Sequence, residues 1–205
     1  MKRPIAEFVN VTLNAGSEAE HARFEHEAWQ ILRRKQGYVT HRIYQRLGSP
    51  LDRLVYSEWE SAKAVDGARQ PLQGTPLMRR ARATIAGAPR RVLREIVGPI
   101  TSTKGLDLGD GAIAASAIGH LKGATDSWRA SEQELWKALA SQPGHITHVL
   151  LRRIGEPLEV GSFSHWTDSQ AFQAALARVD SAAGAGIAEA LTAPLDYVLY
   201  GLLRD

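Results

Sequence analysis

Residues 37–51 of this chain have the sequence GYVTHRIYQRLGSPL, and residues 144–158 have the sequence GHITHVLLRRIGEPL. The likeness at this spacing of 107 positions continues to a Ser-x-Trp motif, which ends at Trp59 in one copy and at Trp166 in the other. Between positions 37 and 64, 10 of 28 residues are identical to those 107 positions later, whereas ordinary composition gives about two by chance. Self-similarity at a fixed spacing is the signature of a repeat, so we infer that the chain is a duplication.

Both copies show the same succession of strand and helix patterns. Alternation of apolar and polar residues predicts strands, and apolar residues three and four positions apart predict helices. Ser17 followed by Glu20 predicts a capping box at the start of the first helix. In the first copy we expect strands at 5–13, 38–47, 54–59 and 91–97, a helix at 17–35 and a helical stretch after Ser61 broken by Pro71, Gly74 and Pro76. In the second copy we expect strands at 112–121, 145–154, 159–166 and 195–203, a helix at 125–141 and helical pieces within 168–191.

This order, β-α-β-β-α-β given twice, is the ferredoxin-like arrangement. A lone sheet of this kind is covered by helices on one face and left bare on the other, and two copies can bury their bare faces against each other. We therefore predict an α+β fold of two ferredoxin-like βαββαβ repeats packed sheet-to-sheet as a pseudo-dimeric α/β barrel. The expected boundaries are a first repeat at 1–97, a glycine-rich linker at 98–111 and a second repeat at 112–205. Such a barrel is complete within a monomer, although further homo-oligomerisation stays open.

Composition excludes several classes of protein. The 205 residues are 44% hydrophobic and 23% charged, as in ordinary globular domains. No apolar stretch approaches the ~18 residues of a membrane-spanning helix, and no apolar segment of a signal peptide follows the basic N-terminus, so a cytoplasmic location is expected. Cysteine is absent, which excludes disulfides and thiolate metal sites.

Charge and short motifs narrow the choice further. Residues 1–100 hold 17 Lys and Arg against 10 Asp and Glu, and residues 101–205 hold 8 against 12. No DNA- or RNA-binding motif accompanies the basic half, so a nucleic-acid partner is not expected. Neither a dinucleotide-binding glycine motif nor a P-loop is present, and both the serine nucleophile elbow and the H-E-x-x-H zinc motif are absent too. The sequence therefore gives little support to a nucleotide cofactor or to a hydrolase triad.

The repeated features resemble the antibiotic biosynthesis monooxygenase (ABM) family of dimeric α/β barrels. They are a helix with a central Trp, a turn ending in Gly, a strand ending in Arg, a Gly-x-Pro hairpin and a Ser-x-Trp strand end. The most similar stretches are YSEWESAKA at residues 56–64 and SHWTDSQAF at residues 164–172. Because that family builds its barrel from two chains, this protein looks like two such subunits fused. The resemblance implies either oxidation of polycyclic phenols by molecular oxygen without metal or flavin, or haem degradation.

The chain departs from the family's functional pattern at several positions. In the oxygenases, the Trp that matches Trp59 works with an Asn four residues earlier, a Tyr shortly afterwards and an Arg in the following helix. The haem-degrading members need a helix-borne His after this Trp, and neither copy has one. At the position of the Asn the two copies carry Val55 and Ser162, and at the position of the Tyr they carry Val65 and Phe172. At the position of the Arg they carry Arg79 and Gly186.

A histidine recurs on the second strand of each copy. Strand alternation places His41 with Val39 and Ile43 on an apolar face and Tyr38 on the opposite face, and His148 has the same setting. Such a histidine is either a packed core residue or an acid–base group in a pocket. We take His41 and His148 as the candidate catalytic residues.

Further candidates are aromatic or basic. Trp59 and Trp166 can stack on an aromatic ligand or, alternatively, anchor the helix that follows. Arg46 and Arg153 can bind an anionic group or pair with a carboxylate, and the resemblance adds Arg79. The candidate substrate-binding residues are therefore Trp59, Trp166, Arg46, Arg153 and Arg79.

Two pairs of residues receive a more ordinary interpretation. His145 and His165 are expected to face the same way from adjacent strands and could hold a transition metal together with a carboxylate. No closely spaced ligand motif supports this, so no metal is predicted. His21 and Glu25, one helical turn apart, are typical of a solvated helix face.

Three functions remain open. The first is a cofactor-independent monooxygenase-like protein that binds a small aromatic or apolar molecule in a cleft between helices and sheet, with His41 or His148 as base. The second is a haem-binding or haem-degrading protein with His41, His120 or His148 as axial ligand. The third is a non-catalytic ligand-binding or structural protein. The Ala/Gly-rich run at 182–186 predicts a thin helical layer in the second copy, which would widen its cleft or mark its loss.

Overall fold

The computed structural model describes residues 3–98, 108–123, 127–179 and 183–203. The chain divides into two compact units. The first comprises the chain up to Glu95 and its last residues from Leu202, and the second runs from Ile96 to Gly201. Most of the expected linker, residues 99–107, lies outside the described residues, as do parts of the Ala/Gly-rich run.

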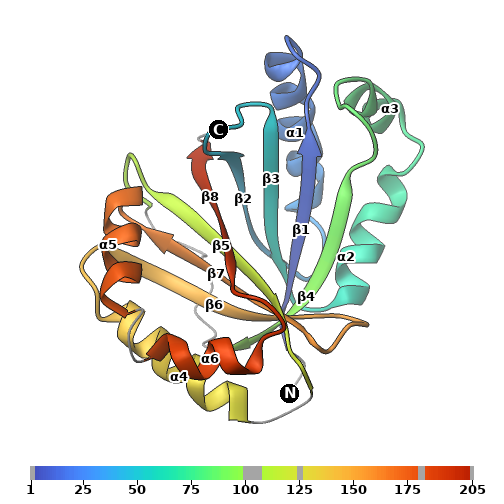
Figure 1. Cartoon of the computed structure of the whole chain (residues 1–205). Helices are drawn as coiled ribbons and strands as arrows, with labels where there is room; N and C mark the ends of the chain where they lie inside the picture. Colours follow the sequence, from blue (N-terminus) through green and yellow to red (C-terminus); the bar gives the residue numbers. More distant parts are fainter. Residues whose placement is uncertain (1–2, 99–107, 124–126, 180–182, 204–205) are drawn as a thin grey trace. The chain divides into compact units, whose positions relative to one another are not determined.

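The first unit is a four-stranded antiparallel sheet with its helices on one face (Figure 1). Its strands lie in the order β4-β1-β3-β2. Its elements are β1 (Ile5–Thr12), α1 (Glu18–Leu32), β2 (Tyr38–Arg46), β3 (Asp52–Trp59), α2 (Ala62–Arg69), a 3-10 turn (Gln70–Leu72), α3 (Pro76–Ala83) and β4 (Arg90–Gly98).

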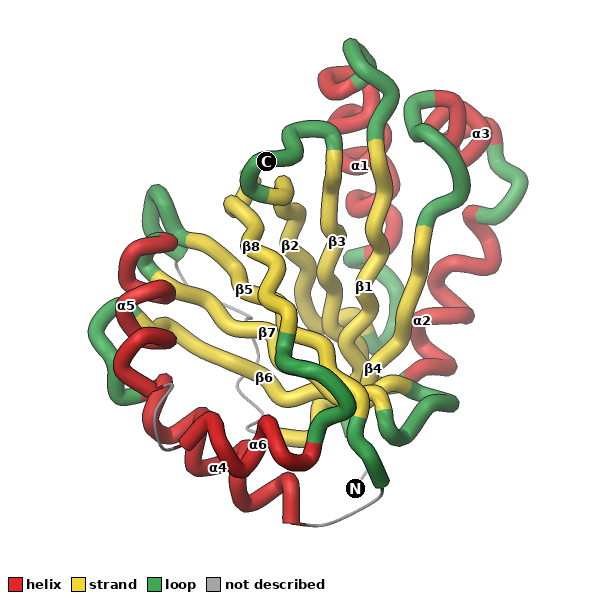
Figure 2. Tube along the Cα trace, in the orientation of Figure 1, coloured by secondary structure: helices red, strands yellow, loops and turns green. Residues whose placement is uncertain are grey.

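The second unit repeats this plan with the strand order β6-β7-β5-β8 (Figure 2). Its elements are β5 (Ile113–His120), α4 (Ser127–Ala140), β6 (His145–Arg153), β7 (Glu159–Trp166), α5 (Ser169–Val179), α6 (Ala183–Ala190) and β8 (Asp196–Leu203). The predicted order β-α-β-β-α-β is confirmed in both units, and with it the α+β class and the ferredoxin-like repeats. Among the residues that the structure describes, no helix is both long and apolar enough to cross a membrane.

Local chemistry explains where the helices of the first unit begin. The Ser61 hydroxyl accepts a hydrogen bond from the Ala64 amide at the start of α2, and Thr75 does the same for α3 with Pro76 in its first turn. The capping box predicted for α1 is wrong in one respect. Ser17 is the N-cap, but its hydroxyl donates to the carbonyl oxygens of Asn14 (2.6 Å) and Thr84 (2.8 Å) instead of accepting from the helix. Ser17 thus attaches the start of α1 to the segment that follows α3.

Each unit has its own hydrophobic core between its helices and its sheet. Trp59 and Trp166 are fully buried at the centres of the two cores, and each donates its indole N–H to the serine two residues earlier on its strand, at 2.9 Å. The core of the first unit consists of Ile5, Trp29, Leu32, Ile43, Val55, Trp59, Val65, Ala68 and Leu72. The core of the second unit includes Ile113, Leu135, Trp136, Leu139, Leu150, Trp166, Phe172, Ile187 and Leu191.

A β-bulge in the second strand of each repeat changes which side chains share a face. In β2, Tyr38 pairs with Trp59 but Thr40 pairs with Glu58, so Val39 is an extra residue that shifts the alternation. Tyr38 consequently lies on the same face as His41, with its hydroxyl 2.6 Å from His41 Nδ1. The prediction that they face opposite ways is wrong because it assumed regular alternation.

The bulge recurs in β6 between His145 and Thr147. It places His145 Nε2 3.2 Å from His148 Nδ1, whereas Thr147 is the residue that pairs with His165. His165 is buried beside Phe163. The suggested metal pair of His145 and His165 is therefore wrong, because the two side chains lie on different faces.

Candidate functional site

The first unit contains a cleft of about 200 Å³ between its sheet and its helices, which we call the first cleft. Its walls are largely apolar and come from β1, β3, α1 and the segment between α2 and β4. The apolar lining consists of Val9, Val11, Phe24, Ala28, Trp29, Leu32, Val55, Leu72, Met78, Ala81, Ile85 and Pro89. A cavity of roughly 150 Å³ can hold benzene, so the first cleft has room for an aromatic ring with substituents.

A buried carboxylate organises one side of this cleft. The Glu7 side chain is fully buried on β1. It accepts hydrogen bonds from Arg69 (2.7 Å), Arg91 (2.6 Å) and the Ser57 hydroxyl (3.0 Å), while Arg69 Nε lies 2.6 Å from its other oxygen. Both arginines line the cleft. Glu7 thus fixes two guanidinium groups at the cleft wall.

α1 contributes His21 and Glu25 to the lining of the same cleft. His21 Nδ1 is 2.7 Å from the Thr84 hydroxyl, and His21 Nε2 is 3.5 Å from Glu25 Oε1. Both side chains are largely buried, at 8% and 11% exposure. The expectation of a solvated helix face is wrong for this pair, because the two residues continue the apolar stripe of α1 toward the cleft.

Three arginines bring positive charge to the first cleft. Arg69 and Arg91 share Glu7, and Arg91 also donates to Asp66 at 2.9 Å. Arg82 lines the cleft as well, and within the described part of the chain no ion pair neutralises it. The three guanidinium groups thus lie near the carboxylates of Glu7, Asp66 and Glu25, and an anionic ligand would be stabilised next to Arg82.

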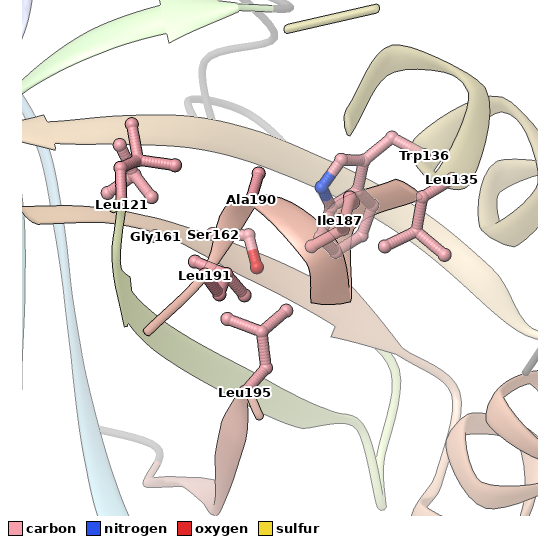
Figure 3. A pocket seen from close by; sticks show the side chains of 10 residues that line it. Leu121, Leu135, Trp136, Gly161, Ser162, Ile187, Ala190, Leu191 and Leu195 are labelled. Atoms are coloured by element: carbon pink, nitrogen blue, oxygen red, sulfur yellow. The ribbon is translucent and has the colours of Figure 1, made fainter. Parts of the chain in front are cut away.

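The corresponding space in the second unit, the second cleft, is nearly filled. It measures about 30 Å³, and Figure 3 shows its side chains gathered between α6 and the strands. It is lined by Leu121, Leu135, Trp136, Val160, Gly161, Ser162, Ile187, Ala190, Leu191 and Leu195. None of these residues is charged, so among the described side chains the lining of the second cleft has no equivalent of the first cleft's ionic groups.

Strand register identifies what replaced those groups. Glu7 pairs with Ser57, and its counterpart Ala115 pairs with Ser164. Likewise, the strand position of Arg91 is taken by Tyr197 in the second unit. Arg69 lies ten residues after Trp59, and the residue ten after Trp166 is Leu176. The second repeat thus carries apolar or aromatic residues where the first has its buried ion pairs.

The two candidate catalytic histidines lie outside the linings of these two clefts. The His41 ring stacks on Trp29 with 4.1 Å between centroids, and Trp29 itself lines the first cleft. His148 stacks on Trp136 at 4.5 Å. Burial and the neighbouring His145 lower the pKa of His148 to about 4. Both histidines therefore support the tryptophan of the first helix in their repeat.

The candidate substrate-binding residues are also absent from the two linings. Trp59 and Trp166 are core residues, as described above. Arg46 is 51% exposed and lies 3.8 Å from Asp52, and Arg79 donates to the Gly74 carbonyl at 2.5 Å. Arg82, three residues after Arg79 on α3, is the arginine of this helix that lines the cleft.

Arg153 belongs to a polar cluster at the hairpin of the second unit. His120, Glu156 and Glu159 lie close enough to hold a metal ion, but Arg153 donates to Glu159 at 2.7 Å and lies 2.9 Å from Glu156. The carboxylates therefore already have a cationic partner.

Sequence reasoning missed the ionic groups of the first cleft. His21 and Glu25 stand three residues before Phe24 and Ala28, which is the spacing of one helix face. Glu7 shares strand parity with Val9 and Val11, both cleft residues. On both α1 and β1, polar residues within an otherwise apolar face were the sequence pattern that could have revealed these groups.

The chain resembles known proteins in part of its sequence. The sequence profile described as "antibiotic biosynthesis monooxygenase" matches residues 117–185, which lie in the second repeat. The resemblance inferred from the Ser-x-Trp repeats is therefore confirmed. No curated protein sequence shows a significant match to the chain.

Solved structures match the whole chain. A candidate monooxygenase from Fusobacterium nucleatum has a TM-score of 0.77 at 10% identity, covering 98% of this chain and 93% of its own. One from Lactobacillus acidophilus has a TM-score of 0.69 at 10% identity, covering 99% and 100%. An anthrone oxidase-like protein has a TM-score of 0.67 at 15% identity, covering 100% and 92%. At these identities the likeness shows the fold, and the predicted α+β fold with both repeats in one chain is confirmed.

Proposed function

We propose that the protein is a monooxygenase of the ABM type that binds a small aromatic molecule in the first cleft and oxidises it without a bound cofactor. The observation that carries the proposal is the first cleft itself, an apolar space of about 200 Å³ bordered by a histidine–glutamate pair and by arginines. The family match and the fold of the solved structures above support the reaction class.

The protein itself supplies no electrons in this reaction. In oxidation without a cofactor, the substrate supplies the electrons that reduce molecular oxygen. The protein binds the substrate, favours its deprotonated form and excludes water. Apolar walls exclude water, and the arginines stabilise a developing negative charge.

A haem does not fit the histidines first considered for it. None of His41, His120 and His148 lines either of the two clefts. These clefts therefore offer a haem no axial ligand from the three residues, and we propose no step through one. Titration with haemin tests this point, and a sharpened Soret band that disappears in a variant of one of these histidines would contradict it.

Oxygen uptake tests the proposed function. Purified protein is mixed with anthrone- or quinol-type compounds in an oxygen electrode, and we expect uptake above the uncatalysed rate. The variant Ala28→Phe fills the first cleft from α1 and should abolish most of the uptake. The matched control Ala190→Phe adds the same ring to the lining of the second cleft, and uptake should persist if that variant folds.

One outcome would decide against an enzyme, and another against the first cleft as its site. No uptake with any such compound, combined with binding of the same compounds in the first cleft, would favour the non-catalytic ligand-binding function. That alternative is favoured by Val55 and Val65, which stand where the family's oxygenases carry Asn and Tyr. Uptake that Ala28→Phe leaves unchanged would place the reaction elsewhere.

A further inference from the structure

We infer that His21, assisted by Glu25, is the proton acceptor of the first cleft, and that the cleft's ligand is an acidic phenol or enol bound as its anion beside Arg82. The inference rests on the proposed function for its substrate but names a base that lies on a different element from His41 and His148. It is carried by the hydrogen bonds around His21.

The hydrogen bonds of the Thr84 hydroxyl determine which ring nitrogen of neutral His21 carries the proton. The Thr84 hydroxyl donates to the Ala81 carbonyl at 2.6 Å, so its oxygen is left to accept a hydrogen bond. His21 Nδ1, at 2.7 Å, must supply it as an N–H. In neutral His21 the proton therefore sits on Nδ1, and the lone pair of Nε2 is available to accept another.

Glu25 is placed to stabilise the result of that transfer. Its Oε1 atom is buried and, within the described residues, has no hydrogen-bond donor. It lies 3.5 Å from His21 Nε2. Proton arrival at Nε2 converts the ring to an imidazolium next to this carboxylate, which replaces an unfavourable contact between a lone pair and a carboxylate with an ion pair.

The proton transfer needs no group beyond the ligand, His21, Glu25 and Arg82. The O–H bond of the ligand breaks, the N–H bond at His21 Nε2 forms, and the electron pair stays on the ligand oxygen. The new positive charge on His21 is matched by Glu25. The new negative charge on the ligand is matched by Arg82, which within the described residues has no carboxylate partner. The charged residues that line the cleft with His21 are Glu25, Arg69, Arg82 and Arg91.

The class of ligand follows from the same lining. Apolar walls and Trp29 suit an aromatic ring, and the base requires an acidic hydroxyl. Aliphatic alcohols do not have one, and neutral hydrocarbons would gain nothing from Arg82, whereas an anion would be attracted to it. A phenol or an enolised ketone meets all three requirements.

Binding of 4-nitrophenol tests the inference without turnover, because its anion has a visible absorption band that the neutral phenol lacks. We expect the wild-type protein to bind the anion and to lower the probe's apparent pKa. His21→Asn keeps an N–H near the position of Nδ1 but removes Nε2, and it should weaken anion binding about tenfold or more. The control His26→Asn changes an exposed histidine of the same helix and should leave binding unchanged.

Two further variants separate a chemical role from a structural one. Glu25→Gln should reduce the shift in the probe's pKa, and Arg82→Ala should weaken anion binding about tenfold. The control Arg23→Ala changes an exposed arginine of α1 outside the cleft lining and should leave anion binding unchanged. Added imidazole should restore part of the pKa shift in His21→Ala. A purely structural role for His21 predicts no such rescue.

The outcomes are distinguishable from those of the oxygen-uptake test. Anion binding that depends on His21 without any oxygen uptake supports this inference and removes the oxygenase. Oxygen uptake that His21→Asn leaves unchanged overturns this inference and keeps the oxygenase. Failure of the wild-type protein to bind the anion also overturns it, and so does binding as tight as that of the wild type by folded His21→Asn and Arg82→Ala.

Discussion

Replacement of Glu7 by glutamine should destabilise the first unit strongly, because Glu7 is a fully buried anion held by two guanidinium groups and a hydroxyl. Removal of one partner of a buried ion pair costs about 3–5 kcal/mol. The Arg69 and Arg91 side chains retain 22% and 37% exposure, so water can solvate them in the variant and reduce this penalty. We therefore expect Glu7→Gln to lower the free energy of unfolding by about 2–3 kcal/mol.

The assay is urea unfolding followed by circular dichroism, with the midpoint compared at constant m-value. The matched control is Glu27→Gln. Glu27 lies 4.0 Å from Arg80 on the surface, where the two side chains are 55% and 60% exposed, and its loss should cost less than about 0.5 kcal/mol. A cost for Glu7→Gln below about 1 kcal/mol, or equal to that of the control, would refute the assignment of Glu7 as the organising anion.

Three further predictions concern the scaffold. Gly37→Ala should lower the melting temperature more than Gly48→Ala. Both glycines have positive φ, but a Cβ at Gly37 would lie 2.6 Å from the Ala64 Cβ, whereas nothing lies within 4 Å of a Cβ at Gly48. Equal losses in the two variants would contradict this. The pKa of His148 is lowered from 6.5 to about 4 in the folded protein, so the unfolded chain binds the proton first as the pH falls, and stability is lost between these two values. His148→Gln removes this group and should make that loss of stability smaller. An unchanged pH profile of the urea midpoints would count against this prediction. Leu191→Ala should cost about 2–5 kcal/mol and open the second cleft to benzene, measured by calorimetry; no binding would mean that the site collapses.

The fold could be predicted from the sequence because the signals were duplicated and local. Gly37 and Gly48 have positive φ at the ends of predicted elements, and Gly74 and Pro76, predicted to break the helical stretch, lie where the 3-10 turn gives way to α3. These residues determine backbone conformation through short-range sterics and capping. What failed was the alternation around Val39, because a bulge depends on pairing with the neighbouring strand and leaves no clear local signal.

The candidate site was harder to predict for a physical reason. Whether a cleft is open depends on the volume of side chains from several elements, as the contrast between about 200 Å³ and about 30 Å³ in two similar repeats illustrates. His21 and Glu25 looked like a solvated pair because their burial depends on α3 and Thr84, far along the chain. The catalytic roles assigned to His41 and His148 stay predictions, and the present geometry directs attention to α1 instead.

The two core clusters have no residue in common. Substitutions at separate, non-contacting sites have nearly additive effects on stability. A directed-evolution library at Ala28, Leu72, Met78 and Ala81 would therefore reshape the ligand space of the first unit while the second keeps its own packing. The duplication thus allows the ligand space of one repeat to be varied apart from the core packing of the other.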